Sequence, residues 1–117
     1  MAKTVTLYGI PNCDTVKKAR VWLDAQGIPY SFHDFKKQGL DAKLAQGWLK
    51  TLGPELLINR KGTTWRKLDE AVQAKAATPA GALALMLEQP SVIKRPVLDR
   101  DGALSVGFTP ETYAKYF

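Results

Sequence analysis

The chain contains a single cysteine, Cys13, at a position where a thiol can become reactive. It follows the turn 10–12 and precedes a stretch of helical periodicity that begins at Asp14. Asn12 is a good N-cap residue, and Asp14 suits the first turn of a helix. A thiol at a helix N-terminus faces free backbone N–H groups and the positive end of the helix dipole, and both favour the thiolate. Such positions can lower a cysteine pKa from about 8.5 to roughly 3.5–7.5, so the sequence predicts that Cys13 is a nucleophile.

The same residue has a second interpretation, which stays open at this point. A lone cysteine in a soluble protein is most often a small buried hydrophobe. The carboxylate of Asp14, next to Cys13, would also raise the pKa of the thiol. Nothing in the sequence decides between a reactive and an inert Cys13.

Other chemistries fit these residues less well. A tyrosine-phosphatase loop needs an arginine six residues after its cysteine, but Ala19 stands there and Arg20 comes one place late. His33 is the only histidine, and we expect it to be an ordinary strand residue. One histidine with one cysteine makes no metal site, so no metal is predicted. The sequence also has neither a Gly-x-Gly-x-x-Gly nor a Walker motif.

Composition places the chain among ordinary globular domains. Its 117 residues suit one domain, and 45% hydrophobic with 24% charged residues is typical. We see no signal-peptide pattern at the N-terminus and no apolar run near the roughly 18 residues of a membrane span. One cysteine excludes an internal disulfide. These observations predict a cytoplasmic protein without a membrane partner.

The net charge of +6 comes from 17 basic and 11 acidic residues. The basic residues form scattered pairs such as Lys17-Lys18 and Lys94-Arg95, and no run reaches the five or six like charges of a basic tail. Nucleic acid is therefore not an expected partner. An anionic small substrate, an acidic thiol partner or a plain solvated surface explains the charge equally well.

The periodicity of the first third predicts a βαβ unit. Residues 4–8 and 28–35 read as strands, and residues 14–26 read as a helix that stops at Gly27. Two strands joined by a helix of this length should be parallel, with a right-handed crossover.

The rest of the chain changes character twice. Residues 40–88 predict only helices: 40–51, a turn over 55–58, a short helix from Thr63 or Thr64 through Ala74, and a helix over 80–88 after the Thr78-Pro79 cap. Residues 92–98 lead into a strand, the Asp99–Gly102 turn follows, and 103–107 form the second strand of a hairpin. Thr109-Pro110 starts a final helix to Phe117. This order predicts an α/β, thioredoxin-like fold: a single domain over residues 1–117, with a mixed four-stranded sheet and an all-helical insertion at about 40–90.

Three short motifs follow one another along the chain: Pro-x-Cys at a helix start, Asn-Arg-Lys-Gly-Thr over 59–63, and Lys-Arg-Pro over 94–96 before the hairpin. Their order resembles the ArsC/Spx family, which includes glutaredoxin-linked arsenate reductases and the Spx regulators. The chain looks most like the YffB branch of the family, whose members keep one cysteine and end in a similar Gly-Phe-x-Pro-Glu-x-Tyr. The resemblance covers nearly all 117 residues.

The resemblance implies roles for particular residues. Cys13 matches the nucleophile, Arg60 and Arg95 match arginines that hold an oxyanion or thiolate, and Pro96 matches the cis-proline beside the active thiol. We add Asn12 and Lys94 to the predicted anion-binding set. An arginine presents a planar fork suited to arsenate, phosphate or carboxylate. From sequence alone, a surface salt bridge explains either arginine equally well.

Three positions depart from the pattern of the family's arsenate reductases. Phe108 stands where they carry a third arginine, Gly9 where they carry a histidine, and Val16 where they carry a serine. An oxyanion site that lacks this arginine and serine should hold arsenate poorly. Val16 also takes the place of the second cysteine of a Cys-x-x-Cys pair, so a Spx-type disulfide switch is excluded.

The expected function is that of a glutathione-linked thiol oxidoreductase with one nucleophilic cysteine. The thiolate would attack an anionic or disulfide substrate, and a second thiol would resolve the mixed disulfide. Glutathione, or a glutaredoxin-like donor, is the expected reductant, because its carboxylates suit Arg60, Arg95 and Lys94; no bound cofactor is expected. Two alternatives stay open: a non-catalytic Spx-like interaction module with RNA polymerase as partner, and a genuine arsenate reductase.

Overall fold

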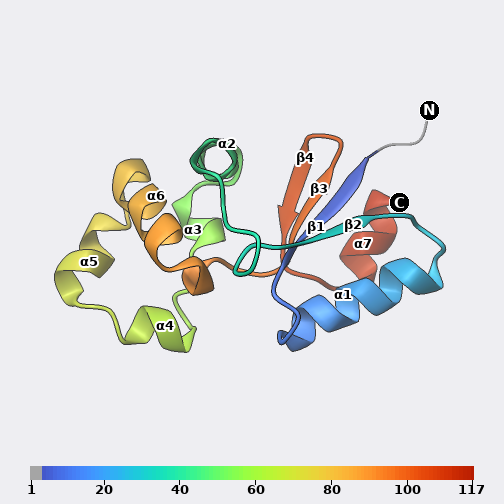
Figure 1. Cartoon of the computed structure of the whole chain (residues 1–117), viewed down its shortest axis with the longest axis horizontal. Helices are drawn as coiled ribbons and strands as arrows, with labels where there is room; N and C mark the ends of the chain where they lie inside the picture. Colours follow the sequence, from blue (N-terminus) through green and yellow to red (C-terminus); the bar gives the residue numbers. More distant parts are fainter. Residues whose placement is uncertain (1–3) are drawn as a thin grey trace. The chain divides into compact units, whose positions relative to one another are not determined.

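The computed structural model describes residues 4–117, which form two compact units (Figure 1). The first unit contains the described residues up to Gln38 together with Arg95–Phe117, and the second contains Gly39–Lys94. The prediction that the whole chain is one domain stays a prediction.

The first unit is built on a mixed four-stranded sheet in the order β2-β1-β3-β4. Its strands are β1 (Val5–Gly9), β2 (Ser31–Asp34), β3 (Val97–Arg100) and β4 (Ala103–Val106). β1 pairs in parallel with β2 and antiparallel with β3, and β3 pairs antiparallel with β4. The predicted parallel βαβ unit and C-terminal hairpin are both present.

Two helices, α1 (Asp14–Ala25) and α7 (Pro110–Tyr116), pack on the sheet. Burial alternates along β1, so Val5 and Leu7 point to the same face. One buried cluster joins both helices to this face, and its members are Val5, Leu7, Ala19, Leu23, Leu98 and Tyr113. The strand order together with these two helices defines the predicted thioredoxin-like fold.

The turns that end and begin these helices follow the sequence signals. Gly27 has φ +68°, and the N–H of Ile28 donates to the carbonyl of Leu23, which ends α1 as predicted. Thr109 caps α7, because its side chain accepts from the N–H of Thr112 at 3.1 Å and the Thr112 hydroxyl accepts in return.

The second unit is helical. Its elements are α2 (Ala42–Leu52), α3 (Pro54–Leu57), α4 (Thr63–Arg66), α5 (Glu70–Lys75), α6 (Pro79–Glu88) and the 3₁₀ helix η1 (Pro90–Val92). Trp48, Leu57, Met86 and Ile93 are among the side chains buried in it. The all-helical prediction therefore holds for this segment, with one isolated bridge between Ile58 and Ile93.

Several predicted elements differ in extent, and the strand predicted over 28–35 covers only Ser31–Asp34. The single helix through Ala74 is two helices, since α4 ends at Arg66 and Asp69 adopts the extended N-cap conformation before α5. The Gln73 amide donates to the carbonyl of Trp65 at 2.8 Å and ties the two together.

The strand into which residues 92–98 were expected to lead begins at Val97. Val92 belongs to η1, and both Val92 and Ile93 are buried. Their apolar character reflects the helical unit's interior and not a strand, while Pro96 has no N–H to give to a ladder.

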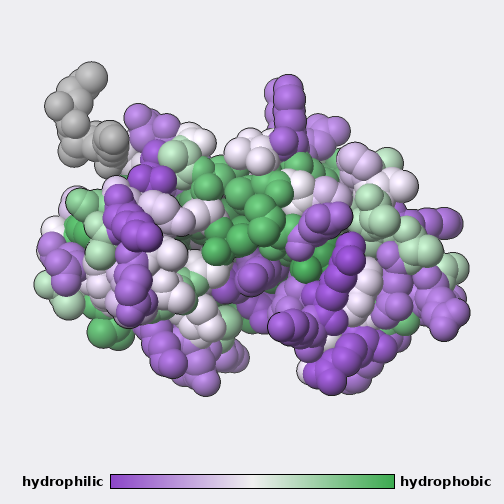
Figure 2. Space-filling view, turned by 180° about the vertical axis from the view of Figure 1, so that it is seen from behind, coloured by the Kyte–Doolittle hydropathy of each residue, from purple (hydrophilic) through white to green (hydrophobic). Residues whose placement is uncertain are grey.

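The surface is mixed in polarity, as the scattered charges of the sequence suggest. Figure 2 shows hydrophilic side chains over much of one face, with apolar side chains exposed among them. Of the helices in residues 4–117, none has the length and apolar character needed to cross a membrane.

Candidate functional site

Cys13 itself occupies the N-cap of α1, so the prediction that Asn12 is the N-cap was wrong. Cys13 has an extended backbone, with φ −97° and ψ 124°, and its carbonyl accepts the first helical hydrogen bond from Lys17 N–H at 2.9 Å. Asn12 is exposed in the preceding turn. The thiol thus lies beside the free N–H groups of the first turn.

The surroundings of Cys13 favour its thiolate. Partial burial by itself raises the pKa of the thiol, but this effect is outweighed. The backbone N–H of Val16, a side-chain hydrogen bond from Arg95 with its positive charge, and the backbone N–H of Thr15 all lower it. The net pKa of Cys13 lies below its usual value, despite the neighbouring carboxylate of Asp14.

Arg95 is positioned by the loop that enters β3. The peptide bond between Arg95 and Pro96 is cis, and Arg95 is half-buried. Pro96 is buried, and its carbonyl accepts a hydrogen bond from Gly107 N–H at 2.9 Å. This bond joins the cation of the site to the segment after β4, where Phe108 follows.

Gly9 and Val16, two of the departures from the reductase pattern, meet in space. A Cβ atom placed on Gly9 would lie 2.8 Å from Cγ2 of Val16, and Val16 is completely buried. The valine methyl therefore fills space that any side chain at position 9 would need. Together these two residues make an apolar, closely packed wall at the positions where the family resemblance implies a histidine and a serine in the arsenate reductases.

Phe108, the third departure, is packed into an aromatic cluster. Its ring meets Tyr113 edge-on, with 4.6 Å between centroids and 86° between planes. Trp22 of α1 also meets Tyr113 edge-on at 5.7 Å and 88°. The position that matches the third arginine thus carries no charge and is fixed by ring packing.

Arg60 and Lys94 belong to the second unit. Arg60 is exposed, with its guanidinium carbon 5.6 Å from the centroid of the Trp65 ring. Lys94 is exposed, and its backbone N–H donates to the carbonyl of Leu57 at 2.6 Å. Their predicted part in anion binding, like that of Asn12, stays a prediction. The thiol site in the first unit rests on Cys13 and Arg95.

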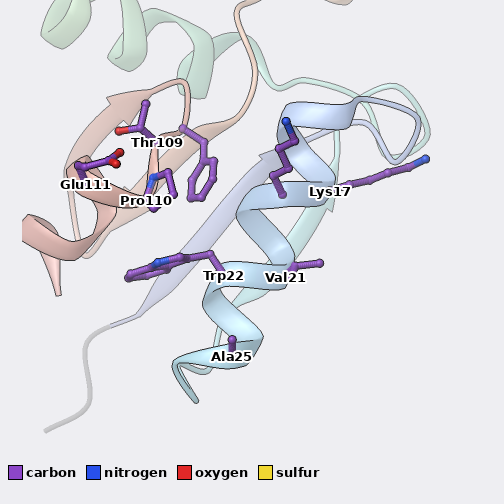
Figure 3. A pocket seen from close by; sticks show the side chains of 9 residues that line it. Lys17, Val21, Trp22, Ala25, Thr109, Pro110 and Glu111 are labelled. Carbon is purple, nitrogen blue, oxygen red and sulfur yellow. The ribbon is translucent and has the colours of Figure 1, made fainter.

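A hollow beside α1 was not anticipated from the sequence. It is lined by Trp22 and its helical neighbours on one side and by residues 108–111, which lead into α7, on the other (Figure 3). In the sequence, Trp22 stands at helical spacing with the apolar residues of α1, so it looks like a core residue. The adjacent Val21, which is 66% exposed, was the available signal, because a large apolar side chain on the solvent face marks a surface of interest.

No metal centre is evident in the part of the chain that the structure describes. Within residues 4–117, no three histidine, cysteine or acidic side chains gather closely enough to hold an ion. His33 lies in β2, with its ring 5.1 Å from that of Tyr8.

This arrangement supports nucleophilic thiol chemistry. The sulfur is only partly buried, it receives hydrogen bonds that favour the thiolate, and a guanidinium stands next to it. A thiolate is the form that attacks a disulfide sulfur or an oxyanion centre. Fold and site define a thioredoxin-like protein with one activated thiol at a helix N-terminus.

Comparison with known proteins places the chain within this class. The family model described as "ArsC family" matches residues 8–116, and the chain belongs to that family. A solution structure of an arsenate reductase (ArsC) related protein from Brucella melitensis is 58% identical, with TM-score 0.79, over 97% of this chain and 94% of that chain. The structure of the YFFB protein is 51% identical, with TM-score 0.90, over 96% and 97% of the two chains. An uncharacterized protein of Haemophilus influenzae is 40% identical over 97% of this chain and 98% of its own length.

Proposed function

We propose that the protein is a glutathione-linked thiol oxidoreductase whose nucleophile is Cys13. The observation that carries this proposal is the hydrogen bond and charge that Arg95 brings to a sulfur already at the N-cap of α1. A guanidinium keeps its charge at every physiological pH, so it favours the thiolate throughout.

The reaction consists of two thiol–disulfide exchanges. The Cys13 thiolate attacks the glutathione sulfur of a mixed disulfide, the Cys13–glutathione bond forms, and the other thiol leaves as a thiolate that takes a proton from water. A second glutathione thiolate then attacks the adduct. This step releases Cys13 as thiolate and yields oxidised glutathione, so one external glutathione thiol is consumed for each mixed disulfide, and the disulfide bond passes from the substrate to oxidised glutathione.

The need for an external thiol follows from the composition. Cys13 is the only cysteine, and no second thiol of the chain can resolve the adduct. Glutathione fits because it is a soluble thiol with two carboxylates, and Arg95 offers a charge-assisted contact for one of them. Arg60 and Lys94 are the further candidates for such contacts.

Although the chain belongs to the ArsC family, we do not propose arsenate as its preferred substrate. Phe108 lies in the aromatic cluster where the third arginine of the pattern would stand, and Gly9 and Val16 present an apolar wall. An arsenate dianion would lack both a cation and a polar contact there.

Trapping with oxidised glutathione tests the proposal. The protein should gain the mass of one glutathionyl group, and added reduced glutathione should remove it. Cys13→Ser should take up none. Catalysis is then measured with the mixed disulfide of glutathione and 2-mercaptoethanol as substrate. Coupled glutathione reductase reports the oxidised glutathione that is formed. An absence of the adduct, or an adduct that reduced glutathione fails to discharge, would contradict the proposed function.

A further inference from the structure

The hollow between α1 and the start of α7 runs along the helix that begins after Cys13. Its volume is about 690 Å³. The lining residues are Lys17, Lys18, Val21, Trp22 and Ala25 from α1, and Phe108, Thr109, Pro110 and Glu111 from the segment that begins α7. In Figure 3 the side chain of Trp22 extends from α1 toward the segment that carries Thr109, Pro110 and Glu111.

The walls are apolar and held in place. Trp22 and Phe108 each meet the fully buried ring of Tyr113 edge-on, which fixes their orientation from beneath. Val21 stays 66% exposed at the rim. Rigid aromatic walls with an exposed aliphatic rim suit a flat or chain-like apolar group of small-molecule size.

Both sides of the hollow are linked through backbone hydrogen bonds to the segments that carry Cys13 and Arg95. On one side, Lys17 is one helical turn beyond Cys13, and its N–H donates to the Cys13 carbonyl. From Lys17 to Ala25 the helix rises about 12 Å. On the other side, Gly107 N–H bonds to the carbonyl of Pro96, which follows the Arg95 that contacts the sulfur, and Phe108 comes next.

The end of the hollow nearer to Cys13 is basic. Lys17 and Lys18 are both exposed and both line it, and Lys18 shares a helix face with Trp22, four residues later. An apolar ligand that also carries a carboxylate can therefore place its charge near these ammonium groups and its body against the rings. Glu111 is the single acidic residue of the lining.

We propose that this hollow holds the apolar body of the thiol that leaves when Cys13 attacks an anionic mixed disulfide of glutathione. The proposal rests on the function proposed above and adds the substrate class. Glutathione becomes bonded to Cys13, and the released thiol is an apolar, preferably aromatic, molecule with a carboxylate. Oxidised glutathione alone leaves the apolar walls unused.

Direct binding tests the hollow without any thiol chemistry. The Cys13→Ser protein is titrated with 4-phenylbutyrate, and with the uncharged 4-phenyl-1-butanol, while its backbone and Trp22 indole N–H signals are followed by NMR. We expect saturable shifts centred on Val21, Trp22 and Phe108, with several-fold tighter binding of the carboxylate at low salt. Val21→Glu should weaken the binding at least tenfold. Val72→Glu is the matched control, since Val72 is an exposed helical valine in α5 and should leave binding unchanged.

Activity then tests the occupant. Mixed disulfides of glutathione with 4-phenylbutane-1-thiol and with 2-mercaptoethanol are both alkanethiol disulfides, so the leaving thiols differ mainly in apolar size. We expect kcat/KM to be about tenfold higher for the phenylbutyl compound, and Val21→Glu to remove that preference while keeping the 2-mercaptoethanol rate.

The possible failures are distinguishable. Turnover without any apolar preference overturns the present inference and leaves the proposed function intact. Saturable probe binding without turnover of any disulfide contradicts the proposed function, and the assignment of a leaving thiol falls with it. Shifts that are absent, that survive Val21→Glu, or that follow protein concentration in place of probe concentration overturn the site, and the last result would assign the hollow to a second copy of the chain.

Discussion

Arg95 hydrogen bonds to the sulfur of Cys13 and places its positive charge beside it. The two residues are 82 positions apart in sequence, and the parallel and antiparallel pairings of β1 bring the loops that carry them together. Two independent features therefore stabilise the thiolate: the backbone N–H groups of its own helix and a cation from a distant loop.

Replacing Arg95 should weaken the nucleophile without removing it. Arg95→Ala should slow formation of the glutathione adduct at pH 7 several-fold, because the thiolate loses a charge-assisted hydrogen bond. Arg95→Lys should recover part of the rate. Arg66→Ala, a change at an exposed arginine of α4, is the control and should react like the parent protein. Equal rates for Arg95→Ala and the parent protein would remove Arg95 from the mechanism.

Gly9 and Val16 should behave as an energetically coupled pair. Gly9→Ala places a methyl 2.8 Å from Val16 Cγ2 and should lower the free energy of unfolding by about 1–3 kcal/mol, the usual range for an overpacked core. In the double variant with Val16→Ala, that penalty should shrink, giving a coupling of at least about 0.5 kcal/mol in urea unfolding. Strict additivity would show that the close contact is not what excludes a side chain at position 9.

Tyr113 should tolerate loss of its hydroxyl. The ring is completely buried, and within residues 4–117 its hydroxyl finds no hydrogen-bond partner. Tyr113→Phe should therefore leave the free energy of unfolding at pH 7 unchanged or raise it by up to about 1 kcal/mol.

The same residue makes stability depend on alkaline pH. Burial, with a smaller effect of Tyr116, raises the pKa of Tyr113, so the folded state holds the phenol neutral. The stability from this neutral phenol is present below pH 10 and is lost as the pH rises from about 10 toward the folded pKa. The free energy of unfolding, measured with denaturant, should decrease more between pH 8 and pH 11 for the parent protein than for Tyr113→Phe. An equal decrease in the two proteins would contradict the assignment.

Arsenate should be a poor substrate. With glutathione and a glutaredoxin as donors, reduction should be weak or absent because Phe108 provides no charge where the pattern has its third arginine. Phe108→Arg should raise the rate while lowering stability by about 0.5–1.5 kcal/mol through loss of the ring pair with Tyr113. Arsenate reduction by the parent protein as fast as by a family member with all three arginines would refute this account.

Most elements could be predicted because local signals and burial agree. Thr78 and Thr109 cap helices with proline at the first position, as expected, and Gly27 ends α1 at positive φ. The predictions failed where an apolar run is compatible with more than one kind of secondary structure. Val92 and Ile93 look like a strand, but they are buried in the helical unit, because hydrophobicity alone does not distinguish the two.

The place of Cys13 at the start of a helix was predictable from its turn, but the balance of its pKa was not. Burial opposes the thiolate, and only tertiary structure shows that Arg95 contacts the sulfur. The meeting of Gly9 with Val16 and the hollow beside Trp22 were likewise invisible, since both join segments whose proximity follows from packing and not from spacing.

The pH dependence of Cys13 alkylation tests the central claim most directly. Iodoacetamide modification of the sole thiol is followed by mass spectrometry between pH 4 and pH 10. We expect a rate profile whose midpoint lies below that of a free cysteine, and a higher midpoint for Arg95→Ala. A midpoint at or above about 8.5, the value of a free cysteine, would contradict a stabilised thiolate and the mechanism built on it.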